Sequence, residues 1–180
     1  MSTSRAALRY AKALLLEADQ HNTTDQMLED MQSVYVTIQA SKDLRLALAN
    51  PIIKAVDKKN VLSEVFVELS QATHNLFALL VHNKRTDLLA DIAKAYIDLY
   101  NEMNGIKEVE VITAAELTPE LEAKILVKAK EISKTDKVLL TNKINPDLLG
   151  GFIIRVGGIE YNASVFNQFQ KIKKEFTKSL

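Results

Sequence analysis

The stretch NEMNGIKEVEVITA, residues 101–114, divides the chain into two parts of different composition. All five glycines of the 180-residue sequence lie at or after Gly105, and the residues before it contain a single proline, Pro51. Glycine suits turns and strand connections but destabilises helix interiors. We therefore expect residues 1–104 to form an all-helical domain, and residues 105–180 to form a second domain that combines strands with helices.

The N-terminal part is predicted to be a six-helix bundle. Serine and threonine residues stand at suitable N-cap positions, and Asn50-Pro51 ends one helix because the residue before a proline disfavours helical geometry. The expected helices cover about residues 4–20, 24–40, 42–49, 55–68, 71–82 and 86–102. Their connections are short, so neighbouring helices are expected to pack antiparallel.

The C-terminal part is predicted to be a small sheet covered by two helices. One helix begins at Pro119, which occupies a first helical position, and the other begins near Ala163 and runs to the end of the chain. Strands are expected at VEVITA (109–114), KVLLTNKI (137–144), FIIRV (152–156) and a short segment with Ile159 and Tyr161. The whole chain is therefore predicted to be α+β.

Charge and composition exclude several classes of protein. Lys plus Arg and Asp plus Glu each number 23, so the formal net charge is zero and the basic footprint of a nucleic-acid binder is missing. No apolar run approaches the ~20 residues that span a bilayer. Cysteine is absent, which excludes disulfides and thiolate sites. We expect no nucleic-acid partner and no membrane-spanning segment.

No residue pattern indicates catalysis, cofactor binding or a metal centre. The Gly-Gly pair at 150–151 leads into a strand, whereas a phosphate loop leads from a strand into a helix. His74 and His82 are eight residues apart, which does not match the spacing of a helical metal pair. Glu29 and Asp30 are interpreted as surface acids near a helix start, where they favour the helix dipole.

Two helices carry more apolar surface than one packed face requires. The first has a broad stripe that includes Tyr10 and Leu14, and the segment LFALLV (residues 76–81) of the fifth is apolar all round. A helix that is apolar on every side is either central in a core or docks a partner. Both interpretations stay open here: ordinary core, or a groove that accepts an amphipathic helix of another protein.

Four segments, in order and over the whole chain, resemble the delta subunit of F-type ATP synthases, called oligomycin-sensitivity-conferring protein in mitochondria. The glycine-rich segment at 145–172 is the most specific of the four. The segments are RYAKALLLEA (9–18), NLFALLVHNKRTDLLADIAKAY (75–96), VEVITAAELTPE (109–120) and NPDLLGGFIIRVGGIEYNASVFNQFQKI (145–172).

This resemblance implies a stator subunit without catalytic activity or cofactor. The N-terminal domain would hold the N-terminal helices of alpha subunits of the catalytic head, and the C-terminal domain would grip the b subunits of the peripheral stalk. The protein would be present in a single copy and would reach the membrane only through the complex, at the cytoplasmic face of the bacterial inner membrane. A free-standing helical adaptor that binds one amphipathic peptide is the alternative.

The resemblance also implies which residues contact the alpha subunit, in a groove between the first and fifth helices. These residues are Tyr10, Ala13 and Leu14 from the first helix and Leu76, Leu79, Leu80 and Asn83 from the fifth. Gly150, Gly151 and Gly157 would be structural glycines of the C-terminal signature. The opening residues 1–18 have no acid before Glu17 and look like a transit peptide, but in this family they form a working helix.

Overall fold

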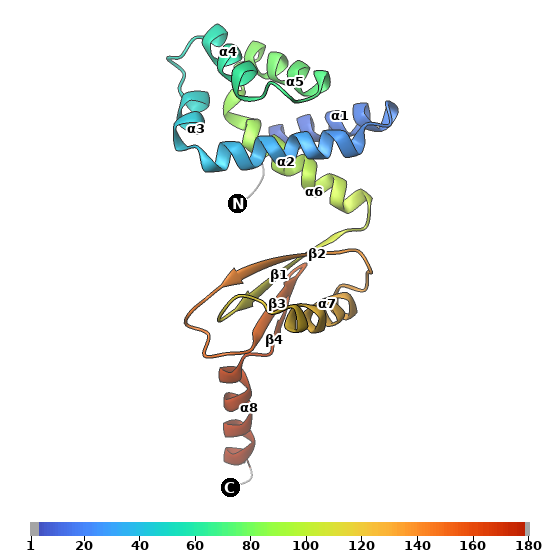
Figure 1. Cartoon of the computed structure of the whole chain (residues 1–180), viewed down its shortest axis with the longest axis vertical. Coiled ribbons are helices and arrows are strands. Elements are labelled where there is room, and N and C mark those ends of the chain that lie inside the picture. Colours follow the sequence, from blue (N-terminus) through green and yellow to red (C-terminus); the bar gives the residue numbers. More distant parts are fainter. Residues whose placement is uncertain (1–3, 179–180) are drawn as a thin grey trace. The chain divides into compact units, whose positions relative to one another are not determined.

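The computed structural model describes the backbone of residues 4–178, and the side chains of residues 4–170, 173 and 174. The chain divides into two compact units, an N-terminal unit that ends at Tyr100 and a C-terminal unit that begins at Asn101. The expected combination of helices with a sheet is confirmed (Figure 1).

The N-terminal unit consists of helices joined by short connections, with no strand among its described residues. Its elements are α1 (Arg5–Gln20), α2 (Thr24–Ala40), α3 (Lys42–Ala49), α4 (Ala55–Val65), α5 (Gln71–His82), the 3-10 turn η1 (Thr86–Leu88) and α6 (Leu89–Met103). Ser4, Ser41 and Ser70 cap α1, α3 and α5, and each hydroxyl accepts a hydrogen bond from the backbone N–H three residues later. These local bonds explain why the helices begin where the sequence predicts.

Two helix boundaries differ from the prediction. α4 ends at Val65 rather than near residue 68, because Phe66 leaves helical geometry and packs its ring 5.5 Å from that of Phe77 in the core. The start of the predicted sixth helix is the separate turn η1, where the buried Thr86 hydroxyl donates to the Leu48 carbonyl at 2.8 Å. Tertiary contacts therefore set both boundaries.

The core of the N-terminal unit is one contiguous apolar cluster. α6 lies along it with Ile92 and Tyr96 fully buried, and Ala7 and Ala11 allow α1 to approach closely. The Tyr96 hydroxyl donates to the Thr24 carbonyl at 3.2 Å, which satisfies the polar end of this large buried side chain.

The C-terminal unit contains a four-stranded mixed sheet. Its strands are β1 (Lys107–Thr113), β2 (Val138–Ile144), β3 (Phe152–Val156) and β4 (Ile159–Asn162), in the spatial order β2-β1-β3-β4. β1 and β2 are parallel and α7 (Pro119–Ser133) connects them, whereas β3 is antiparallel to both β1 and β4 (Figure 1). A parallel pair requires such a crossover.

One helix covers this sheet in the described part of the unit. Val109, Val111 and Ile154 of the strands pack with Ile125 and Ala129 of α7 to form a small core. The final helix, α8 (Val165–Lys178), contributes none of its described side chains to that core. The prediction of two covering helices is therefore wrong for the described side chains, because the apolar face of the sheet is already filled by α7.

Candidate partner-binding groove

A cavity of about 120 Å³ lies between α1 and α5 in the N-terminal unit. Five of the seven residues that the resemblance implies line it: Tyr10, Ala13, Leu14, Leu76 and Leu79. Glu17, Ala72 and Asn75 complete the wall. The sequence analysis missed these three, although each lies three, four or seven residues from a predicted one, which is the spacing of a shared helix face.

The floor and the rim of this α1/α5 groove differ in exposure. Leu14 and Leu76 are buried and belong both to the groove floor and to the core of the unit. Leu79 is 47% exposed, so its side chain stands at the rim and is accessible to a partner. The groove therefore presents apolar surface on a floor that packs against the core of the unit.

Asn83 and Leu80 occupy different places from the other predicted residues. The Asn83 side-chain amide donates to the Tyr10 hydroxyl at 3.1 Å, so it ties the end of α5 to α1 at the exposed surface. Leu80 has no exposed surface and lies in the core. Leu80 does not line the cavity, because successive helical residues point about 100° apart and Leu79 already faces the groove.

A buried carboxylate fixes the start of α5 behind the groove. Asp30 of α2 accepts three hydrogen bonds, from the Ser70 backbone N–H at 3.0 Å, the Ser70 hydroxyl at 2.5 Å and the Thr73 hydroxyl at 2.6 Å. Its interpretation as a surface acid is wrong, since the side chain is buried against the first turn of α5. A carboxylate suits this position because three donors and a helix N-terminus converge on it.

Two tyrosines of α6 donate hydrogen bonds to the start of α2 and do not form a reactive site. Burial raises the pKa of Tyr96, and the neighbouring Tyr100 and Asp25 raise it further. The Tyr100 hydroxyl donates to an Asp25 carboxylate oxygen at 2.5 Å, and this bond raises the pKa of Tyr100. Both side chains are therefore neutral donors at physiological pH.

The signature glycines of the C-terminal unit position the start of α8. A Cβ atom on Gly151 would collide with the Ala163 carbonyl oxygen, and the φ of +78° at Gly151 disfavours any side chain. The Gly150 carbonyl accepts a hydrogen bond from the Val165 N–H at 3.0 Å. Gly157 has a φ of +52° in the β3–β4 turn, with open space around it. Gly151 and Gly157 thus adopt backbone conformations that suit glycine, and the structural role implied by the resemblance stays a prediction.

Known proteins resemble this chain over its full length. The family model described as ATP synthase delta (OSCP) subunit matches residues 6–176. The chain belongs to this family. Two relatives named ATP synthase subunit delta are 42% identical, from Flavobacterium psychrophilum, and 38% identical, from Flavobacterium johnsoniae. Each alignment covers 98% of this chain and 99% of the relative.

The fold is also similar to that of a solved structure. A chain in the cryo-EM structure of the Toxoplasma gondii mitochondrial ATP synthase hexamer matches with a TM-score of 0.74 at 22% identity, over 97% of this chain and 98% of that chain. At that identity the likeness concerns the fold alone.

Family membership settles the general role. This delta-family chain is a stator component of the peripheral stalk of an ATP synthase, and it is a non-catalytic subunit. The expectation that it is not an enzyme is thereby confirmed. Among the described residues, no helix is both long enough and apolar enough to cross a bilayer. No group of three or more potential metal-binding side chains occurs in that same part of the chain.

Proposed function

We propose that the two units act as separate domains that join the catalytic head to the peripheral stalk. The N-terminal unit binds the N-terminal helix of an alpha subunit in the α1/α5 groove, and the C-terminal unit holds the b subunits. One copy per complex resists the torque of the rotor while a proton-translocating F-type synthase makes ATP. The protein works at the cytoplasmic face of a bacterial inner membrane, through the complex alone.

The observation that carries the first half of this proposal is the construction of the groove. Buried Leu14 and Leu76 form its floor, and half-exposed Leu79 stands at its rim. An amphipathic helix docks by placing apolar side chains at helical spacing into such a groove. Ala13 is exposed and small, so it lets a second helix come close to α1.

Polar groups at the ends of the groove favour one register and orientation of the bound helix. Glu17 and Asn75 line the cavity, and the Asn83–Tyr10 hydrogen bond lies at the exposed surface. Such groups contribute mainly to register and specificity, whereas the apolar contacts contribute most of the affinity.

A titration of the full-length protein with a synthetic peptide tests the groove. The peptide copies the N-terminal helix of the alpha subunit from the same organism, and saturable one-to-one binding is expected. Leu79→Ala should weaken binding about tenfold, because it removes a half-exposed apolar contact. Val36→Ala on α2 is the matched control, since Val36 is exposed but lies outside the groove. Equal affinities for the two variants would contradict the assignment.

Exposed aromatic side chains on α8 support the second half of the proposal. Phe166 and Phe169 are 58% and 66% exposed, which is unusual for phenylalanine unless a partner covers it. We expect Phe169→Ser to weaken binding of a segment from the end of a b subunit, as measured by titration. The control Leu139→Ser changes an exposed apolar residue of β2, and its binding should equal that of the unsubstituted protein.

A further inference from the structure

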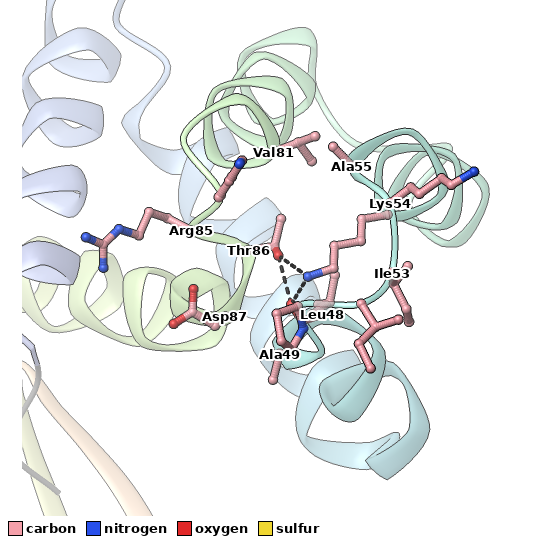
Figure 2. A pocket seen from close by; sticks show the side chains of 13 residues that line it. Leu48, Ala49, Ile53, Lys54, Ala55, Val81, Arg85, Thr86 and Asp87 are labelled. Atoms are coloured by element: carbon pink, nitrogen blue, oxygen red, sulfur yellow. Dashed lines mark hydrogen bonds between the residues drawn. The ribbon is translucent and has the colours of Figure 1, made fainter.

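A second cavity in the N-terminal unit lies apart from the α1/α5 groove. It has a volume of about 520 Å³ and is bounded by the end of α3, the loop into α4, the first turn of α4 and the turn between α5 and η1 (Figure 2). None of its lining residues belongs to the α1/α5 groove. Its size falls within the ~300–1,000 Å³ of typical small-molecule sites.

The ammonium group of Lys58 belongs to the lining of this α3/α4 cavity. The half-buried Lys58 donates from Nζ to the Leu48 carbonyl at 2.7 Å and to the Thr86 hydroxyl at 3.2 Å. The Thr86 hydroxyl in turn donates to the same carbonyl at 2.8 Å. Because an ammonium has three N–H donors, one N–H of Lys58 remains for a ligand.

No carboxylate of the described residues forms an ion pair with Lys58. Asp87 also lines the cavity, but no hydrogen bond or ion pair joins it to the ammonium. Lys58 is half-buried, so its charge is only partly screened by solvent and an anion beside it is attracted. The site therefore favours one added negative charge.

Apolar side chains form about half of the walls around this charge. Pro51, Ile53 and Val81 line the cavity, and Ile52 beside them is 86% exposed, the highest value among the exposed large apolar side chains of the described residues. Lys54 and Arg85 extend away from the Thr86 hydroxyl in Figure 2. The lining thus combines the Lys58 ammonium and three further cations, Lys54, Lys84 and Arg85, with apolar surface, which suits an anion that also carries a hydrocarbon part.

We propose that the α3/α4 cavity binds an aliphatic carboxylate. The carboxylate accepts a hydrogen bond from the free N–H of Lys58, and the hydrocarbon chain packs on Pro51, Ile53 and Val81. α4 begins at this cavity and its N-cap residue makes no side-chain capping bond, so the positive end of the helix adds to the attraction. This binding is separate from the stator role and does not depend on it.

Octanoate is the probe for the first experiment, with 1-octanol as the uncharged probe of equal chain length. The full-length protein is titrated with each and followed by two-dimensional NMR of its backbone amides. Saturable one-to-one shifts at the residues that line the α3/α4 cavity are expected for octanoate, with a millimolar dissociation constant suited to so small a ligand. Octanol should bind at least about tenfold more weakly, because it lacks the charge-assisted bond.

Substitutions then assign the binding to Lys58. Lys58→Met keeps the side-chain stem and should weaken octanoate binding about tenfold, whereas Lys59→Met, its exposed neighbour outside the cavity, should leave it unchanged. Ile52→Ser changes a solvent-exposed residue, cannot harm the core, and should also weaken binding. The proposal is overturned if octanoate does not saturate, if octanol binds equally well, or if both lysine variants and Ile52→Ser bind like the unsubstituted protein.

Discussion

The two units of this delta-family protein use their apolar residues differently. Among the described residues, 22 buried apolar side chains form the N-terminal core and six form the C-terminal core. The larger core buries most of its apolar residues and still leaves Leu79 exposed at a groove. The smaller one depends more on backbone geometry, at Gly151 above all, and on polar contacts across the sheet.

This difference indicates that residues for partner binding and residues for stability can be separated in the N-terminal unit but less easily in the C-terminal unit. Burial of apolar area contributes roughly 25 cal/mol per Å², so a rim residue can be truncated in the N-terminal unit at little cost. In the C-terminal unit, the loss of one tight backbone contact removes a large share of the total stability of that unit. The following substitutions test that contrast in order of expected effect.

Leu80→Ala is expected to have the largest effect, about 2–5 kcal/mol of unfolding free energy, because it leaves a cavity in the N-terminal core. Leu79→Ala, one residue away, should cost under about 1 kcal/mol, since half of its side chain is already solvated. Urea unfolding of both variants measures the difference. Equal losses would mean that α5 has no separable partner-binding face.

Asp30→Ala should cost about 3 kcal/mol, because three donors at the start of α5 lose their acceptor inside the protein. The neighbouring Glu29→Ala removes an exposed carboxylate and should change stability by under about 0.5 kcal/mol. Unfolding titrations of the two variants provide the comparison. A similar small loss for both would show that the Asp30 bonds do not stabilise the fold.

Gly151→Ala should destabilise the C-terminal unit by about 2 kcal/mol or more, because the new Cβ collides with the backbone of Ala163. Gly157→Ala also has a positive φ but meets open space, so only the backbone strain of about 1 kcal/mol is expected. Hydrogen exchange of the β1 and β3 amides reports on this unit specifically. An equal loss of protection in both variants would show that the positive φ alone, and not a steric collision at residue 151, destabilises the unit.

The smallest expected effect concerns an ion-pair row on the outer face of the sheet. Lys143 of β2 pairs with Glu110 of β1, which also faces Arg155 of β3 at 3.5 Å, and Arg155 pairs with Glu160 of β4 at 2.9 Å. The hydrogen bond from Lys143, assisted by Arg155, lowers the pKa of Glu110. Exposed pairs of this kind contribute little to stability, because solvent and salt screen them.

This lowered pKa predicts a weak acid sensitivity of the C-terminal unit. Because the folded-state pKa of Glu110 lies below the unfolded one, its contribution is present above the unfolded pKa and is lost as pH falls through the folded pKa. Lys143→Met should therefore reduce the loss of stability between neutral pH and about pH 3. Lys107→Met, on the same sheet but outside the row, is the control. Identical stability–pH profiles for the two variants would show that the ion-pair row does not contribute to the acid sensitivity.

The sequence by itself determined the division into a helical part and a mixed part. Glycine confined to the region after residue 104 predicts this division, serine caps predict three helix starts, and Thr118-Pro119 predicts the start of α7. The strands follow from β-branched runs such as VEVIT at residues 109–113. All of these signals act over a few residues, so they are readable without knowledge of the fold.

The groove could be predicted only as a pair of helices with excess apolar residues. A segment that is apolar all round does not reveal that Leu79 faces solvent and Leu80 faces the core, since that choice depends on where α1, α2 and α6 pack. Asp30 looks like a surface acid because its donors, Ser70 and Thr73, lie 40 or more residues further along the chain. Lys58 likewise meets Leu48 and Thr86 only after folding. Helix propensity and capping are local, so the sequence by itself determined them. Burial and hydrogen-bond partners depend on contacts between distant segments, so only the tertiary structure decided them.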